Sequence, residues 1–174
     1  LVIVATITPD MAFPSTACQL QHKLGLGKVA SFDLEAACSG FLYALDVADA
    51  MLASGRYQNA LVVGAEKMSS IMDWEDRTTC VLFGDGAGAF VLEKSNENSE
   101  WGILSSNFYS NGNFSDILQT DGGPSFNSQV GKVRMNGKEV FKHAIEKLSS
   151  CLIDAINSAN LKIQDIDFLV PHQA

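Results

Sequence analysis

The sequence has no long hydrophobic run and no excess of basic charge. Its longest apolar runs, such as 60–63 and 87–92, are far shorter than the ~20 residues that cross a bilayer, so a membrane-spanning helix is not expected. The chain has 20 acidic against 12 basic residues. A nucleic-acid-binding protein needs a basic surface to displace counterions, so this balance favours a small-molecule substrate instead.

The sequence also lacks closely spaced cysteine pairs. Its four cysteines are scattered without a C-x-x-C pair, which is typical of neither a zinc site nor a disulfide scaffold: Cys18, Cys38, Cys80 and Cys151. We therefore expect a reducing cytoplasm and no bound metal. The first residues, LVIVATITPD, lack an initiator Met, a basic region and a cleavage site, so they predict a core strand and not a signal peptide. We expect the true N-terminus to lie elsewhere.

Apolar strands alternate with amphipathic helices along the chain. Strands are predicted near 1–7, 30–34, 60–65, 86–94 and 166–174, and helices at 13–25, 41–52 and 137–160. Pro14 suits the first turn of the first helix, and Gly25 suits its C-terminal cap. This alternation predicts an α/β fold with a largely parallel sheet covered on both faces.

One polar segment, SNENSE at 95–100, predicts a linker between two parts of the chain. We place a first domain at 1–95 and a second at 96–174. Helical and extended patterns recur on both sides of the linker, although no sequence repeat is evident.

Cys38 lies where a predicted strand gives way to a helix, in DLEAACSGF. Ligands bind at such junctions in open α/β sheets, and a helix N-terminus stabilises a thiolate, so we expect a lowered pKa at Cys38. The small residues around it leave room for a substrate carbonyl. Cys38 is therefore the candidate nucleophile, and the other three cysteines are expected to be small buried residues.

A cysteine nucleophile needs a base or an electrostatic partner, and three histidines are available. We expect His22 and His143 to be solvated. His172 follows an apolar run and a proline, which would place it at the same sheet edge as Cys38. A purely structural histidine has the same local pattern.

The segment GDGAGAF at 84–90 invites a dinucleotide-binding interpretation. Its glycines precede a predicted strand instead of following one, and the third glycine of the motif is replaced. A turn with close backbone approach is the better interpretation.

Taken together, five segments resemble the β-ketoacyl-acyl-carrier-protein synthase III family of the thiolase superfamily: AFPSTACQLQHKLG, FDLEAACSGFLYAL, ALVVGAE, DRTTCVLFGDGAGAFVLE and VPHQA. The resemblance implies a partial thiolase-like αβαβα layered sandwich with mixed, mainly parallel sheets. The domain at 1–95 would then be the C-terminal part of the first thiolase-like half, and 96–174 the start of the second. It also implies a cytoplasmic homodimer without a cofactor.

The family resemblance further implies a decarboxylative Claisen condensation that initiates fatty-acid synthesis. Cys38 would accept an acyl group from acyl-CoA, and malonyl-acyl-carrier protein would then decarboxylate and attack the Cys38 thioester. His172 matches the family's histidine that donates to the malonyl thioester oxygen. The backbone N–H of Cys38 would form part of a separate oxyanion hole.

Other positions match the family's substrate-binding residues. Arg77 matches an arginine at the nucleotide end of CoA, although a salt bridge to Asp76 is an alternative. Phe13 matches an aromatic residue that reaches across the dimer, although it suits a hydrophobic staple before a helix equally well. Further matches to positions along the acyl channel, each of which suits an ordinary core residue too, are Met68, Phe83, Met135 and Phe141.

A local excess of basic residues predicts docking of an acidic carrier protein. These residues are Lys132, Arg134, Lys138, Lys142 and Lys147. Lys138 and Lys142 are four residues apart and share a helix face, which suits a plain solvated face as well.

The family's pattern continues beyond VPHQA with Asn-x-Arg and a Gly-Asn-Thr-Ser motif, neither of which is present, and the family's N-terminal region is absent. We therefore expect a fragment that is inactive alone. The alternatives are a non-catalytic ketosynthase-like subunit, a type III polyketide synthase and a hydroxymethylglutaryl-CoA synthase. A Cys-His-Asn protease is disfavoured because no C-G-x-C-W signature is present.

Overall fold

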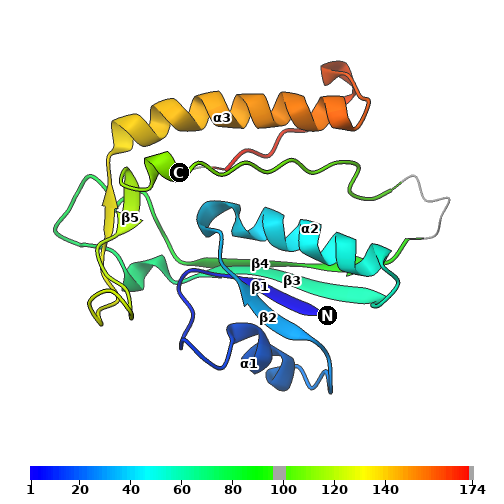
Figure 1. Ribbon diagram of the computed structural model, residues 1–174, viewed down its shortest axis with the longest axis horizontal. Helices are drawn as coiled ribbons and strands as arrows, with labels where there is room; N and C mark the ends of the chain where they lie inside the picture. The colour runs from blue at the N-terminus through cyan, green and yellow to red at the C-terminus, as the bar shows by residue number, and fades with distance from the viewer. Residues whose placement is uncertain (96–100, 173–174) are drawn as a thin grey trace. The chain divides into compact units, whose positions relative to one another are not determined.

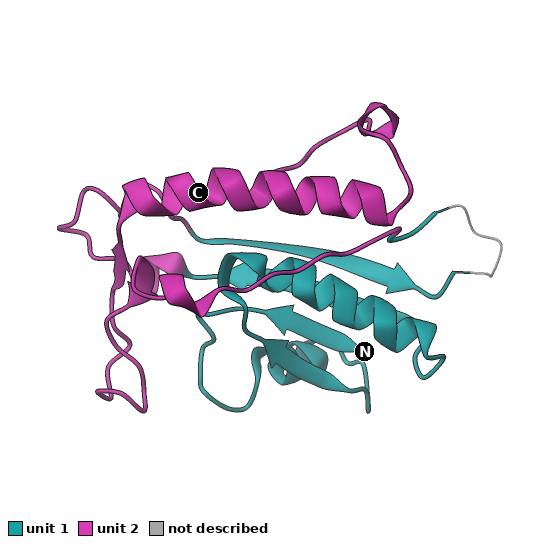
Figure 2. Ribbon diagram, turned by 45° about the horizontal axis from the view of Figure 1, so that its top comes forward, with its two compact units in different colours: residues 1–67, 85–103 teal, residues 68–84, 104–174 magenta. Residues whose placement is uncertain are grey.

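The computed structural model describes residues 1–95 and 101–172 (Figure 1). The chain forms two compact units, coloured separately in Figure 2. Unit 1 comprises residues 1–67 and 85–103, and unit 2 comprises residues 68–84 and 104–174. The predicted linker lies mostly outside the described residues, so a boundary between two thiolase-like halves at 95–96 stays a prediction.

Unit 1 is built on a four-stranded sheet with the order β2-β1-β3-β4 (Figure 1). The strands are β1 (Val2–Ala5), β2 (Ser31–Leu34), β3 (Asn59–Glu66) and β4 (Gly86–Glu93). β1 pairs in parallel with β2 and β3, whereas β4 pairs antiparallel with β3. The α/β class with a mixed, mainly parallel sheet is therefore confirmed. β4 runs antiparallel because no α-helix crosses back over the sheet between β3 and β4.

Helices cover both faces of this sheet, because successive residues of β1 point to opposite sides. Ile3, which is fully buried, belongs to a core cluster with Ala44 and Ala48 of α2 (Gly40–Ala53). Val2 and Val4 form a second cluster with Ala17 of α1 (Thr16–Lys23). Figure 1 shows the two helices on opposite sides of the strands.

Helix α2 begins immediately after Cys38, so its packing bears on the candidate site. A Cβ added to Gly64 of β3 would lie 3.3 Å from the Phe41 ring, so the glycine allows close approach of helix and sheet. Gly55 ends the helix at φ 76°, which is a conformation that glycine adopts without strain.

Helix α1 begins with a double cap. The Ser15 hydroxyl accepts a hydrogen bond from the Cys18 N–H, as an N-cap residue does. The Asp33 carboxylate, on β2, accepts the Thr16 N–H at 2.7 Å and the Ala17 N–H at 2.8 Å. Pro14 therefore precedes the helix, and its expected place in the first turn is wrong because Ser15 is the cap.

Unit 2 contains the long helix α3 (Gly137–Ser158) and an antiparallel pair of short strands. The strands are β5 (Leu118–Thr120) and β6 (Val133–Met135). Asn136 follows β6 and caps α3 by accepting the Glu139 N–H. The start of the helix is thus fixed directly behind Met135.

An irregular segment of unit 2 is tied to the last turns of α3. Ser105 Oγ donates to the Ala155 carbonyl at 2.8 Å. Tyr109 donates to Asp154 at 3.0 Å, and this bond raises the pKa of the tyrosine. The apolar stripe of α3 is partly exposed, with Ile145 at 53%.

The strand predicted at 166–174 is wrong for the described residues. A short 3₁₀ turn occupies Ile163–Asp165, and residues 166–172 pair with no strand. Phe168 and Val170 are almost fully exposed there. Apolar composition alone suggested a strand, but a strand needs a neighbouring strand for its hydrogen bonds.

No helix in the described parts of the chain is both long and apolar enough to cross a membrane.

Candidate active site

Cys38 lies at the edge of unit 1 where three parallel strands end. It follows β2 by four residues and sits in a 3₁₀ turn, Ala37–Ser39, that leads directly into α2. Ala37 adopts φ 45°, a conformation that costs a non-glycine residue on the order of 1–3 kcal/mol. The residue before the candidate nucleophile is therefore strained, and Cys38 itself is exposed.

A carboxylate from β3 organises the same edge. Glu66 accepts the Ile7 N–H at 3.0 Å and the Thr8 hydroxyl at 2.6 Å. The Thr8 hydroxyl in turn accepts the Lys67 N–H at 2.7 Å. These bonds fix the segment that follows β1 against the end of β3.

The pKa of the Cys38 thiol is raised, contrary to the predicted lowering. Burial raises its pKa most strongly, the backbone N–H of Cys38 lowers it in part, and the negative charge of Glu66 raises it further. The residue is exposed as a whole, but the protein around it penalises the thiolate. Helix-terminus activation was expected to dominate, and it fails because the surrounding burial and the Glu66 charge oppose it.

The other cysteines are not the buried residues that we expected. Cys18 is exposed, with its sulfur 3.6 Å from the Ser31 carbonyl, and Cys80 and Cys151 are half-buried. Exposure alone therefore does not single out Cys38. Cys38 is distinguished instead by its position after a strained residue, at the ends of the parallel strands.

The three histidines differ in their surroundings. His22 is exposed, as expected. His143 is half-buried, with its ring 4.1 Å from that of Phe114 and its Nε2 3.7 Å from Glu139, so the prediction of a solvated side chain is wrong. His172 is exposed in the irregular segment of unit 2, and its pairing with Cys38 of unit 1 stays a prediction.

Arg77 lies in unit 2, in a loop that follows a 3₁₀ turn at Met68–Ser70. The expected alternative, a salt bridge to Asp76, is wrong. The Asp76 carboxylate accepts the Thr78 N–H at 2.9 Å and the hydroxyls of Thr78 and Thr79, and the bonds from Thr78 are the main cause of its lowered pKa. Arg77 is exposed and forms no ion pair within 1–95 and 101–172.

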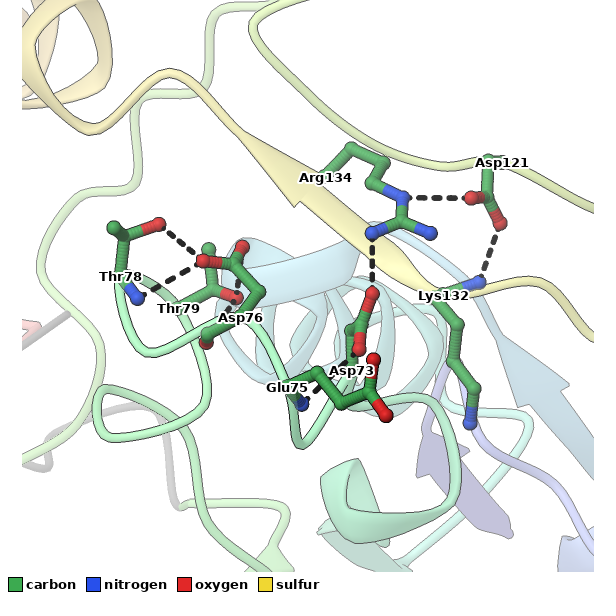
Figure 3. A network of polar contacts seen from close by, with 8 residues as sticks. All are labelled: Asp73, Glu75, Asp76, Thr78, Thr79, Asp121, Lys132 and Arg134. Carbon is green, nitrogen blue, oxygen red and sulfur yellow. Dashed lines mark hydrogen bonds and ion pairs between the residues drawn. The ribbon is translucent and has the colours of Figure 1, made fainter.

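An arginine of β6 lies at the centre of the polar network in Figure 3. Arg134 Nη1 lies 2.6 Å from Asp73 Oδ2, and its Nε lies 2.6 Å from Asp121 Oδ2. The arginine bond is the main cause of the lowered pKa of Asp73. For Asp121, the Lys132 N–H lowers the pKa most and Arg134 lowers it further.

The remaining predicted substrate residues lie at scattered positions. Phe13 is 84% exposed, and Phe141 is exposed on the second turn of α3. Met68 and Phe83 are half-buried in unit 2, and Met135 is half-buried at the end of β6. Their contact with an acyl chain stays a prediction.

The basic patch is smaller than the sequence suggested. Arg134 is engaged by two carboxylates, Lys132 Nζ lies 3.4 Å from the Ser70 carbonyl, and Lys147 pairs with Glu146 at 2.8 Å. Lys138 and Lys142 stay exposed on the first two turns of α3, without ion pairs among the described residues.

GDGAGAF contributes to an antiparallel strand, because Gly86 and Gly88 belong to β4. The turn with close backbone approach that we expected here is wrong, because these two glycines lie in a strand and a Cβ added to either would meet no atom within 4 Å. No cluster of three or more His, Cys, Asp or Glu residues in the described ranges has the arrangement of a metal site.

The roles of three residues in these networks were not predicted from the sequence. Glu66 carries a recognisable signal, a carboxylate at the end of an apolar parallel strand, where ligands and polar clusters gather. Asp33 lies within β2, one residue before the strand ends at Leu34. Arg134 carries no such signal, since its partners lie 13 and 61 residues away.

The family model of 3-oxoacyl-[acyl-carrier-protein (ACP)] synthase III matches residues 32–112, which include Cys38 and Arg77. Among curated relatives, β-ketoacyl-[acyl-carrier-protein] synthase III of Rhizorhabdus wittichii is 52% identical over the whole chain, and that of Ehrlichia canis is 53% identical. The chain spans 54% of the length of each of these relatives.

Solved structures agree with the sequence relatives. The synthase III of Aquifex aeolicus matches 99% of this chain with a TM-score of 0.91 and 44% identity. That of Pseudomonas aeruginosa matches with a TM-score of 0.92 and 36% identity, and the chain covers 53% of each structure. These neighbours carry the thiolase-like α/β fold that the sequence predicted. The whole chain is therefore similar to the β-ketoacyl-acyl-carrier-protein synthase III family, and it spans about half the length of these relatives.

Proposed function

We propose that these residues are the middle of a synthase that joins an acyl primer to malonyl-acyl-carrier protein and so initiates fatty-acid synthesis. The observation that carries the proposal is the position of Cys38, exposed after a strained residue where three parallel strands end, in a chain about half identical to curated synthases III. No cofactor is needed for this reaction. A cytoplasmic homodimer is the assembly that we propose.

In the first half-reaction, the sulfur of Cys38 attacks the thioester carbonyl of acyl-CoA. A sulfur–carbon bond forms at Cys38, and CoA leaves as a thiol that carries the proton lost by Cys38. The raised pKa of Cys38 makes the loss of this proton harder than from an ordinary thiol, so the attack needs a group that accepts it.

In the second half-reaction, malonyl-acyl-carrier protein loses carbon dioxide, and the resulting carbanion attacks the Cys38 thioester. The carbon–sulfur bond to Cys38 breaks, the β-ketoacyl group stays on the carrier protein, and the Cys38 sulfur leaves as a thiolate that takes up a proton from solvent. His172 donates a hydrogen bond to the malonyl thioester oxygen as negative charge develops there. Lys138 and Lys142, exposed on α3, attract the acidic carrier protein.

The proposal is tested with a complete synthase that contains these residues. β-Ketoacyl product is measured from acetyl-CoA and malonyl-acyl-carrier protein. Cys38→Ala should lower the rate at least about a thousandfold, because the nucleophile is lost, whereas Cys18→Ala should be close to wild type. A Cys38→Ala enzyme that condenses at the wild-type rate would refute the proposal.

His172→Ala separates the two half-reactions. Malonyl decarboxylation should fall about a hundredfold or more, and primer transfer to Cys38 should fall much less, since the donor acts on charge that appears only at decarboxylation. Equal losses in both steps would contradict this role. A non-catalytic subunit, the alternative function, would show neither activity.

A further inference from the structure

One arginine joins two segments of unit 2 that lie far apart in sequence. The Arg134 guanidinium donates through Nη1 to Asp73 and through Nε to Asp121, both at 2.6 Å (Figure 3). Because both nitrogens belong to one planar guanidinium, the directions of the two hydrogen bonds are fixed relative to each other, which a lysine ammonium cannot achieve. Arg134 therefore sets the position of each carboxylate relative to β6.

The first of these segments is the loop that carries Arg77. It is attached to β6 at two neighbouring points, because the Val133 N–H also donates to the Ile71 carbonyl at 2.9 Å. Four residues beyond Asp73, the loop presents the Arg77 guanidinium to solvent. Between them, the Asp76 carboxylate accepts hydrogen bonds from Thr78 and does not pair with the Arg77 guanidinium, which stays exposed.

The second segment closes the loop between β5 and β6. Two hydrogen bonds join Asp121 to Lys132. The Lys132 N–H donates to Asp121 Oδ1 at 2.7 Å, and the Asp121 N–H donates to the Lys132 carbonyl at 3.0 Å. A Cβ added to the neighbouring Gly122 would lie 2.7 Å from Gly131, so the two ends of this loop are in contact through their backbones. Asp121 is thus a fixed anchor, not a mobile surface acid.

We infer that Arg134 is a positioning residue, whose bonds to Asp73 and Asp121 hold Arg77 where it receives the phosphorylated nucleotide end of an acyl-CoA. The inference rests on the proposed function. A fixed backbone lowers the entropy cost of pairing an arginine's guanidinium with phosphate oxygens, and displacement of the guanidinium loses the paired geometry. The charge of Arg134, which the sequence suggested for carrier-protein docking, instead forms ion pairs with two carboxylates of the same chain.

The test compares two acyl donors in a complete synthase. Acetyl-CoA carries the nucleotide, whereas the acetyl thioester of N-acetylcysteamine has the same reacting carbonyl and no nucleotide. Arg134→Met should raise the KM for acetyl-CoA about tenfold, with kcat changed less than about twofold. Transfer from the N-acetylcysteamine thioester should stay within about twofold of wild type. Arg56→Met, at an exposed arginine of unit 1, is the matched control and should change neither donor.

Two further variants keep the inference falsifiable. Asp121→Asn removes one bond of the fork and should raise the KM for acetyl-CoA less than Arg134→Met does, so it replaces that variant if Arg134→Met does not fold. In an Arg77→Ala background, Arg134→Met should add little to the KM, since both act on the same contact.

Equal loss with both donors would show a general structural role and overturn the inference. An unchanged KM for acetyl-CoA, or additive effects of the Arg77 and Arg134 variants, would overturn it as well. A wild-type synthase that transfers no acetyl group from either donor would refute the proposed function itself, which is a distinguishable result.

Discussion

Units 1 and 2 hold their important residues by different means. In unit 1, buried apolar side chains of β1 and β3 pack against α1 and α2, and this packing fixes the strand ends where Cys38 lies. In unit 2, Arg134 and its carboxylates fix the loop that carries Arg77, and much of the apolar stripe of α3 is exposed. Packing therefore fixes the proposed reaction centre, and polar contacts fix the proposed recognition segment.

The largest expected difference concerns stability. In the 174-residue chain, Ile3→Ala should lower the free energy of unfolding by about 2–5 kcal/mol, because it opens a cavity in the fully buried core. Ile145→Ala removes the same atoms from an exposed site of α3 and should cost less than about 1 kcal/mol. Urea denaturation measures both, and equal losses would show that the contrast between the units is wrong.

A smaller effect is expected from the polar cap within unit 1. Asp33→Ala leaves the N–H groups of Thr16 and Ala17 without their acceptor and should cost about 1–2 kcal/mol. Asp33→Asn keeps one acceptor oxygen and should cost less. Asp49→Ala, at an exposed position of α2, serves as the control in the same urea experiment and should leave stability unchanged. If Asp33→Ala matches this control, the carboxylate does not cap α1.

Unit 2 should be sensitive to acid through Arg134. The lowered pKa values of Asp73 and Asp121 stabilise the folded state above about pH 4, and this contribution is lost as the pH falls through the lowered values. In Arg134→Met, the free energy of unfolding should therefore fall less on acidification than it does in the wild type. This difference should be smaller than the loss of stability expected for Asp33→Ala. Urea midpoints at pH 7 and below pH 4 report it. An unchanged pH dependence would contradict the ion pairs.

The smallest expected change is a shift in a pH profile. Burial and the Glu66 charge raise the pKa of Cys38, so its alkylation rate should rise at higher pH than that of an ordinary thiol. Glu66→Gln removes the smaller of these two causes and should move the Cys38 profile to lower pH. The profile of Cys18, followed in the same peptide map, is the internal control. A Cys38 profile that does not move in Glu66→Gln would show that Glu66 does not influence the thiol.

The sequence predicted unit 1 better than unit 2 for a physical reason. Apolar runs and helical spacing are local signals, so the strands, α2 and the place of Cys38 could be read from neighbouring residues. The pairing of Arg134 with Asp73 joins residues 61 apart, and composition instead suggested a free basic patch. The raised pKa of Cys38 was missed for a similar reason, because it depends mainly on burial by the surrounding fold and to a smaller extent on Glu66, which belongs to another strand. The prediction of a strand near His172 was wrong because apolar composition does not show whether a neighbouring strand is present to pair with it.

The central claim is that the strand ends of unit 1 present Cys38 as the acyl acceptor. The direct measurement is to incubate a complete synthase with acetyl-CoA alone, digest it, and locate the acetyl group by peptide mass. The account predicts one acetyl group per chain, on the peptide that contains Cys38, and none in Cys38→Ala. An acetyl group on Cys18, Cys80 or Cys151, or acetylation that persists in Cys38→Ala, would contradict it.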